Sequence, residues 1–194
     1  MIMVVQGWLI AACFIGIISL VVTRVQWLRR RGIRAFLFGS TQRSDLIIAP
    51  LVLLGLYCLT TPATGWPMWT PLTWRWWSSA IPGWFGVALA VMAVAGLTWT
   101  LISFGDSFRV GIDEDRPGGL VTTGAFAHSR NPIYVCFAAF ILGVFLTQAN
   151  AVAAVILVML LGFVIRQIGR EERFLRVHYG PEFEAYCARV RRWI

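Results

Sequence analysis

The distribution of apolar and polar positions along the chain predicts a protein built from membrane-spanning helices. Long apolar stretches cover residues 2–22, 46–61, 83–104 and 132–165. The segment Gln148 to Asn150 interrupts the last stretch. The first arm of that stretch, 132–146, reaches only about 22 Å as a helix at 1.5 Å per residue. That is short of the roughly 30 Å hydrocarbon core of a bilayer. We therefore predict a tight helical hairpin and about five membrane helices in all.

Composition supports a lipid-embedded fold rather than a soluble one. Hydrophobic residues make up 58% of the 194 positions and charged residues only 13%, which leaves too little polar surface for a soluble domain. We expect an all-α, polytopic helical bundle that forms a single membrane domain over residues 1–194. Within it, residues 1–104 would hold three N-terminal membrane helices, and residues 105–194 would form a catalytic portion of loop, hairpin and helical tail.

The basic residues predict the orientation of the bundle. All seventeen are arginine, and short cytoplasmic loops of membrane proteins carry the excess of basic residues. Arg75 is the only arginine in the loop 61–82, whereas the others follow the first and third apolar stretches or lie in the tail from Arg166 onward. We therefore expect the N-terminus outside, and the C-terminus with any active site in the cytosol.

Charge and cysteine content exclude several other classes. The net charge of +8 is accompanied by no nucleic-acid-binding motif, so we expect no nucleic-acid partner. The cysteines at positions 13, 58, 136 and 187 show no Cys-x-x-Cys spacing. Neither a disulfide framework nor a metal site is therefore indicated.

The tail is predicted to form two helices. The first should continue from the last span through about His178 and stop at Gly180-Pro181, because glycine caps a helix and proline cannot continue one. A second short helix should begin at Glu182, with one apolar face formed by Phe183, Tyr186, Val190 and Trp193. It could lie at the membrane interface or form a lid over a site.

Segment 128–134, His-Ser-Arg-Asn-Pro-Ile-Tyr, is the first candidate for chemistry. Pro132 suits the first turn of a helix and Asn131 suits its N-cap. A helix N-terminus at a membrane surface presents a positive dipole end to an anionic group such as a carboxylate or phosphate. The alternative is a capped helix with one snorkelling arginine.

Two further segments carry weaker signals when each is taken alone. The glycine-rich segment 118–126 lets a ligand approach the backbone, although it matches no phosphate-binding fingerprint. The pair Glu171-Glu172 lies at the cytosolic exit of the last span. It could be a salt-bridged helix surface, with Glu172 paired to Arg176 four residues on, or a hydrogen-bond acceptor for a cofactor.

Taken in order, these segments resemble a known family. The chain reads Gly-Gly-Leu-Val-x-x-Gly-x-Phe at 118–126, Arg-Asn-Pro-x-Tyr at 130–134, Glu-Glu at 171–172 and Tyr-Gly-Pro-Glu-Phe-x-x-Tyr at 179–186. This set is similar to the motifs of the isoprenylcysteine carboxyl methyltransferase family over roughly residues 100–194. The chain departs from the family pattern at three places: Asn131 stands where the family has His, Phe126 where it has Tyr, and Gln167 where it often has Arg.

The resemblance implies a membrane methyltransferase that uses S-adenosyl-L-methionine and releases S-adenosyl-L-homocysteine. By matching positions, the implied cofactor contacts are Gly119, Leu120, Val121, Phe126, His128, Asn131, Pro132, Ile133, Tyr134 and Glu171. Arg130 and Glu172 are the implied catalytic residues, and Arg166, Gln167 and Arg170 the implied substrate contacts. No metal is implied.

The implied substrate is the carboxylate of a prenylcysteine-type lipid, either a small molecule or a prenylated protein C-terminus, reached among membrane lipids. Such an α-carboxyl, with a pKa of about 3.3–3.7, is already ionised at neutral pH, so its methylation needs no general base. Amine methylation, as in phospholipid methyltransferases, would need one, with Glu171 or Glu172 as the candidate. A nicotinamide-dependent lipid reductase and a non-enzymatic membrane scaffold are the remaining alternatives.

Overall fold

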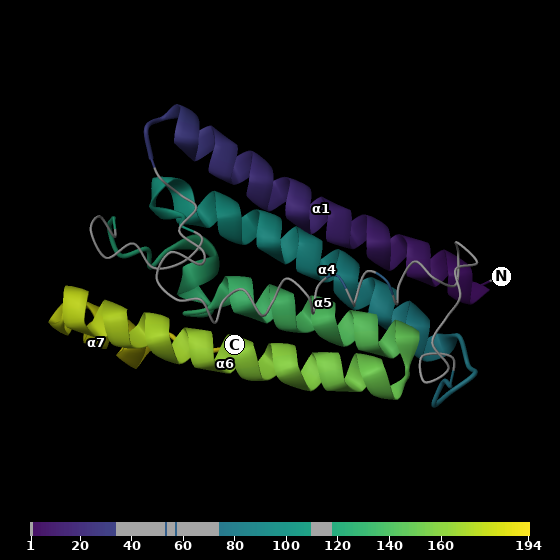
Figure 1. Cartoon of the computed structure of the whole chain (residues 1–194). Helices are drawn as coiled ribbons and strands as arrows, with labels where there is room; N and C mark the ends of the chain where they lie inside the picture. The colour runs from purple at the N-terminus through teal and green to yellow at the C-terminus, as the bar shows by residue number, and fades with distance from the viewer. Residues whose placement is uncertain (1, 34–52, 54–56, 58–73, 110–117) are drawn as a thin grey trace.

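The computed structural model describes residues 2–33, 53, 57, 74–109 and 118–194, which form a helical bundle (Figure 1). Its long helices are α1 (Ile2–Arg30), α4 (Ile81–Phe104), α5 (Pro132–Gln148) and α6 (Ala151–Tyr179), followed by the short α7 (Pro181–Arg189). Two 3-10 helices, η2 (Gly105–Ser107) and η3 (Gly124–Ala127), lie between α4 and α5. No strand occurs among the described residues, so the predicted all-α class is confirmed.

The helices that could cross a membrane agree with most of the predicted spans. Helices α1, α4 and α6 are long and apolar enough to do so, whereas α5 has 17 residues, about 25 Å at 1.5 Å each. The predicted span 46–61 lies outside the described residues except for Leu53 and Tyr57, both of which are helical. Large apolar side chains stand exposed on the outer faces, among them Ile102 at 72% and Val158 at 69%. Lipid is the solvent that suits such faces.

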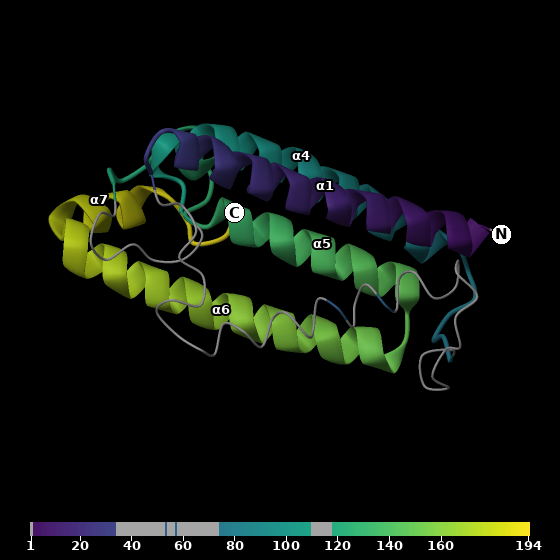
Figure 2. The same cartoon turned by 45° about the horizontal axis from the view of Figure 1, so that its top comes forward.

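Hydrogen bonds join segments that are distant in the sequence at each end of the bundle. Helices α1 and α4 run in the same direction, α5 runs back, and α6 returns (Figures 1 and 2). At the end that holds the N-terminus, the buried Gln6 donates a hydrogen bond to the carbonyl of Ala80, at 2.9 Å. At the opposite end, Arg24 of α1 donates to the carbonyl of Gly105. This second end also holds η3, the start of α5, and the whole of α7. We call it the α7 end.

The predicted hairpin is present and has a clear local cause. Ala149 takes the left-handed conformation that ends α5, with φ 51°. Asn150 then caps α6, because its side chain accepts a hydrogen bond from the backbone N–H of Ala153 at 2.8 Å. Figure 2 shows α5 and α6 running antiparallel from this turn.

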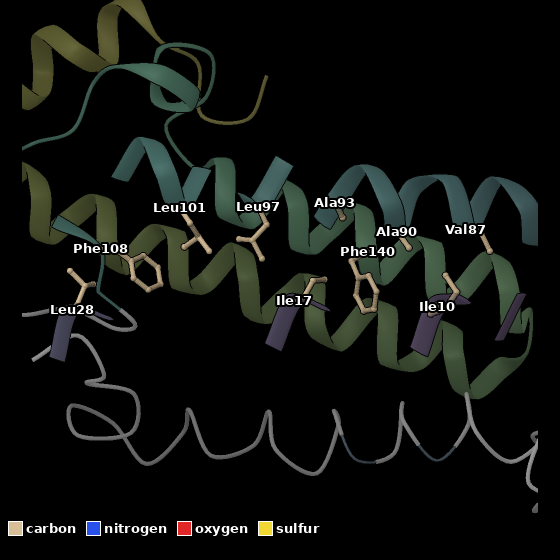
Figure 3. Packing of buried hydrophobic residues seen from close by; sticks show 10 residues of the cluster. All are labelled: Ile10, Ile17, Leu28, Val87, Ala90, Ala93, Leu97, Leu101, Phe108 and Phe140. Carbon is tan, nitrogen blue, oxygen red and sulfur yellow. The ribbon is translucent and has the colours of Figure 1, made fainter. Parts of the chain in front are cut away.

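Small residues allow α4 and α5 to pack with their backbones in close contact. A Cβ atom added to Gly86 of α4 would collide with the carbonyl oxygen of Gly143 on α5, and one added to Gly143 would collide with that of Gly86. Close approach through small residues is a common way for membrane helices to associate. Figure 3 shows the core around this contact, which includes Ala90 and Ala93 of α4, Phe140 of α5, and Ile10 and Ile17 of α1.

The tail agrees with the prediction up to its last residues. Helix α6 ends at Tyr179, Gly180 adopts φ 50°, and α7 begins at Pro181. Phe183 and Tyr186 are buried as expected. The prediction that Val190 and Trp193 extend the same helical face was wrong, since α7 ends at Arg189 and Val190 is extended. Beyond the helix, the carbonyls of Arg191 and Arg192 accept hydrogen bonds from Arg130 and Asn131, the two residues that precede α5.

Candidate functional site

The start of α5 forms the centre of the α7 end. Pro132 occupies the first turn and Asn131 the N-cap position, as predicted. The side chain of Asn131 makes no capping bond, so that part of the prediction was wrong. Its Nδ2 instead donates to Glu172 Oε1 at 3.3 Å and to the carbonyl of Arg192 at 3.1 Å. Asn131 therefore links α5 to α6 and to the end of the chain.

Glu172 is a buried carboxylate, 2% exposed, held between two arginines. Arg192 Nη2 lies 2.6 Å from its Oε2, and Arg130 Nη2 lies 3.5 Å from its Oε1. The predicted alternative partner, Arg176, pairs with Glu184 of α7 instead. Hydrogen bonding to Glu172 raises the pKa of Arg192. A buried charge persists in proteins when it is paired and hydrogen-bonded in this way.

A second group, which we call the Tyr134 network, spans α5 and α6 next to Glu172. The hydroxyl of Tyr134 donates to Glu171 Oε1 at 2.5 Å, and Gln167 Nε2 donates to the same oxygen at 3.1 Å. Arg170 Nη1 in turn donates to Gln167 Oε1 at 3.1 Å. Four predicted site residues are thus joined by hydrogen bonds through Glu171, with Arg170 supplying the positive charge.

Segment 118–126 is fixed against three helices. The hydroxyl of Tyr179 donates to the carbonyl of Gly118, and that of Tyr186 donates to the carbonyl of Phe126, each at 2.7 Å. Gly124 has φ 62° and lies against Ser103 of α4, where a Cβ would collide with the serine side chain. Burial raises the pKa of the Tyr186 hydroxyl to about 12. Between these anchors, Gly119 is exposed and Leu120 and Val121 are half-buried.

Several predicted residues lie away from the Tyr134 network. The ring of Phe126 packs edge to face on Phe104, with centroids 4.7 Å apart, and the ring of His128 lies 5.6 Å from that of Trp99. Both therefore face α4. Arg166 is exposed, and Ile133 packs against the hydrophobic core.

Arg130 combines a structural bond with an open donor. Its backbone N–H donates to the carbonyl of Arg191 at 3.0 Å. Its Nε is buried and has no hydrogen-bond partner within the described residues. Buried donors are nearly always satisfied in native proteins, so this nitrogen suits a bound anionic or carbonyl group.

Sequence reasoning missed Arg192 and the two anchoring tyrosines. Tyr179 and Tyr186 stood in the motif that carried the family resemblance, but no role followed from it. Arg192 gave no local signal, because its partner Glu172 lies 20 positions away in the sequence. Only the fold shows that these residues hold the site together.

The α7 end therefore gathers ion pairs and hydrogen bonds from segments spread over half the sequence, in a bundle whose outer faces are apolar. A membrane-embedded enzyme is the class of protein that such an arrangement suits. A family model described as phospholipid methyltransferase matches residues 77–182, which is more than half of the chain. The chain belongs to this family of membrane methyltransferases, which is of the same type as the isoprenylcysteine carboxyl methyltransferases. No curated protein and no solved structure matches it significantly.

Proposed function

We propose that this protein transfers a methyl group from S-adenosyl-L-methionine to the carboxylate of a lipidated, prenylcysteine-type substrate at the cytosolic face of the membrane. The observation that carries the proposal is the Tyr134 network beside the pair Arg130–Glu172. Together they place acceptors and cations in one small region of the α7 end.

The residues present fit S-adenosyl-L-methionine. Its ammonium group and ribose hydroxyls need acceptors, and Glu171 offers a carboxylate held by Tyr134 and Gln167. Its carboxylate needs donors, and the Nε of Arg130, which has no partner in the described part of the chain, lies beside the start of α5. Residues 119–121 offer backbone between the anchored ends of their segment. When bound, the cofactor supplies an electrophilic methyl group on its sulfonium.

The excess of cations at this end favours an anionic methyl acceptor. Arg170 belongs to the Tyr134 network, and Arg166 stands exposed one turn earlier on α6. An ionised carboxylate needs no proton removed, so the chain's own residues have only to position it and exclude water. We assign the positioning to Arg166 and Arg170, with Gln167 between them.

Glu172 is poorly suited to remove a proton. Both of its oxygens are engaged by arginines, so neither is free to approach a substrate proton. We therefore assign to Glu172 the holding of Arg130 rather than proton abstraction.

A lipid substrate explains the membrane location of the site. The outer faces of α4 and α6 expose large apolar side chains up to the α7 end, including Ile102 and Ile165. A prenyl chain of the substrate would lie against such faces while its carboxylate reaches the arginines. The cofactor would enter from the aqueous side.

The family match favours a second candidate, methylation of a phospholipid amine. An amine acceptor must lose a proton, and Glu171, which accepts hydrogen bonds from the neutral groups of Tyr134 and Gln167, is the candidate base. Under this alternative, Arg166 and Arg170 would bind the lipid phosphate.

Titration and turnover of the protein in lipid nanodiscs test these assignments. We expect binding of S-adenosyl-L-methionine but not of NADPH, and transfer of labelled methyl to a prenylcysteine analogue rather than to phosphatidylethanolamine. Transfer to the amine alone would replace the first candidate by the second. Binding of NADPH alone would contradict both candidates.

A further inference from the structure

The last residues of the chain, 190–194, lie across the start of α5, and we call them the C-terminal strap. Val190 leaves α7 in an extended conformation. The backbone N–H of Arg130 donates to the carbonyl of Arg191 at 3.0 Å, and Asn131 Nδ2 donates to the carbonyl of Arg192 at 3.1 Å. The strap is therefore bonded to the two residues that precede α5.

Arg192 adds a side-chain bond to these backbone contacts. Its guanidinium binds Glu172 through two nitrogens, Nη2 to Oε2 at 2.6 Å and Nε to Oε1 at 3.2 Å. The contacts of this carboxylate with Asn131, at 3.3 Å, and with Arg130, at 3.5 Å, are longer. Two-nitrogen binding of this kind fixes geometry as well as adding energy. Among the described residues, Arg192 thus makes the shortest contact with Glu172 and ties the strap to α6.

The position of Glu172 in the sequence connects this link to the Tyr134 network. Its neighbour Glu171 accepts the bond from Tyr134, which lies in the first turn of α5. The start of α5 is therefore attached to consecutive residues of α6. Without the bond from Arg192, Glu172 would hold the residues before α5 only through its longer contacts with Asn131 and Arg130.

We propose that Arg192 is a positioning residue, which acts through Glu172 to set Arg130 and Asn131 against α6 in the geometry that binds the cofactor. The proposal rests on the proposed function and extends it to a part of the chain beyond the family match, which ends at residue 182. Arg192 itself need not touch cofactor or substrate. Its side chain is half-exposed, whereas that of Glu172 is 3% exposed.

Substitutions of Arg192 in nanodisc-embedded protein test the proposal. We expect Arg192→Gln to weaken S-adenosyl-L-methionine binding and raise its KM on the order of tenfold, as loss of a charge-assisted bond would. The kcat at saturating cofactor should stay within about twofold, since the reacting groups remain. Arg192→Lys should recover part of the affinity, because its ammonium keeps one contact but not the two-nitrogen geometry.

Two further variants make the result specific. Glu172→Gln should weaken cofactor binding like Arg192→Gln, and it carries the test should Arg192→Gln fail to fold. The double variant should bind no more weakly than the weaker single variant, because both remove one interaction. Arg189→Gln is the matched control, since Arg189 is exposed and bonds to Ala185 of its own helix.

Each outcome decides the matter. Wild-type affinity in Arg192→Gln would overturn the proposal. So would a fall in melting temperature and kcat with KM unchanged and no rescue by lysine, because that pattern belongs to a merely structural role. Failure of the wild-type protein itself to bind S-adenosyl-L-methionine would overturn the proposed function and this inference with it.

Discussion

At the scale of single residues, we expect the candidate site to depend most on the hydrogen bond from Tyr134 to Glu171. The hydroxyl of Tyr134 donates to the half-buried Glu171, which also accepts a hydrogen bond from Gln167. We expect Tyr134→Phe to weaken S-adenosyl-L-methionine binding by about tenfold or more, because hydrogen bonds to charged groups contribute about 1.5–3 kcal/mol. Isothermal titration in nanodiscs would measure this.

The matched control is Tyr186→Phe, which also removes one buried hydroxyl. That hydroxyl donates to a backbone carbonyl, of Phe126, rather than to a site carboxylate. We expect a lower melting temperature with a smaller effect on affinity. Equal losses of affinity in the two variants would contradict a specific role of Tyr134 in cofactor binding.

Tyr186 also predicts a dependence of stability on alkaline pH. Its pKa is raised by burial from 10.0 to about 12, so folding favours the neutral hydroxyl. The stability that this group contributes is complete below pH 10 and is lost as the pH rises through 12. Melting temperatures from pH 9 to 12 should therefore fall more steeply for wild type than for Tyr186→Phe. Parallel curves would contradict the assignment.

At the scale of elements, the packing of α4 against α5 positions α5, whose first residues lie in the candidate site. Gly86→Ala would place a Cβ against the backbone carbonyl of Gly143, which cannot move without shifting a helix. We expect a loss of about 1–3 kcal/mol in the free energy of unfolding, typical of overpacking. Denaturation in mixed micelles would measure it.

Gly162→Ala on α6 is the control for that substitution. A Cβ at Gly162 meets nothing within 4 Å, and the residue is exposed. Alanine there should be neutral or stabilise by up to about 1 kcal/mol through helix propensity. If both variants lose stability equally, the glycine contact is not what joins α4 to α5.

At the scale of the whole molecule, the two ends of the bundle should lie on opposite sides of the membrane. We expect Ser79→Cys to react with an impermeant maleimide from outside the cell and Ile194→Cys to react only from the cytosolic side, in a background without native cysteines. Both positions are exposed and belong to opposite ends of the bundle. The expectation follows from the arginine distribution.

Permeabilised cells provide the control for that labelling. Both cysteines should then react equally, which shows that burial does not hide either one. Labelling of both from the same side in intact cells would contradict a bundle that crosses the membrane, and a reversed pattern would contradict the predicted orientation alone.

Much of the fold could be predicted from the sequence because its causes are local. Continuous apolar stretches define α1, α4 and the hairpin, Pro132 and Pro181 stand in the first turns of α5 and α7, and Gly180 ends α6. The family resemblance rested on motifs and their order, and the family match confirms the resemblance itself. Local pattern was misleading where a tertiary contact replaced it, as at Asn131, whose side chain binds Glu172 instead of capping its own helix.

The sequence by itself determined that the protein is a helical membrane bundle and that it resembles a family of membrane methyltransferases, because hydropathy, helix-ending residues and motif order are properties of neighbouring positions. The tertiary structure decided which side chains meet: Tyr134 with Glu171 over 37 positions, Asn131 with Glu172 over 41, and Arg192 with Glu172 over 20. Such pairs depend on how α5, α6 and the strap are placed. That placement depends on contacts between distant segments, such as the contact of Gly86 with Gly143, which no single segment encodes.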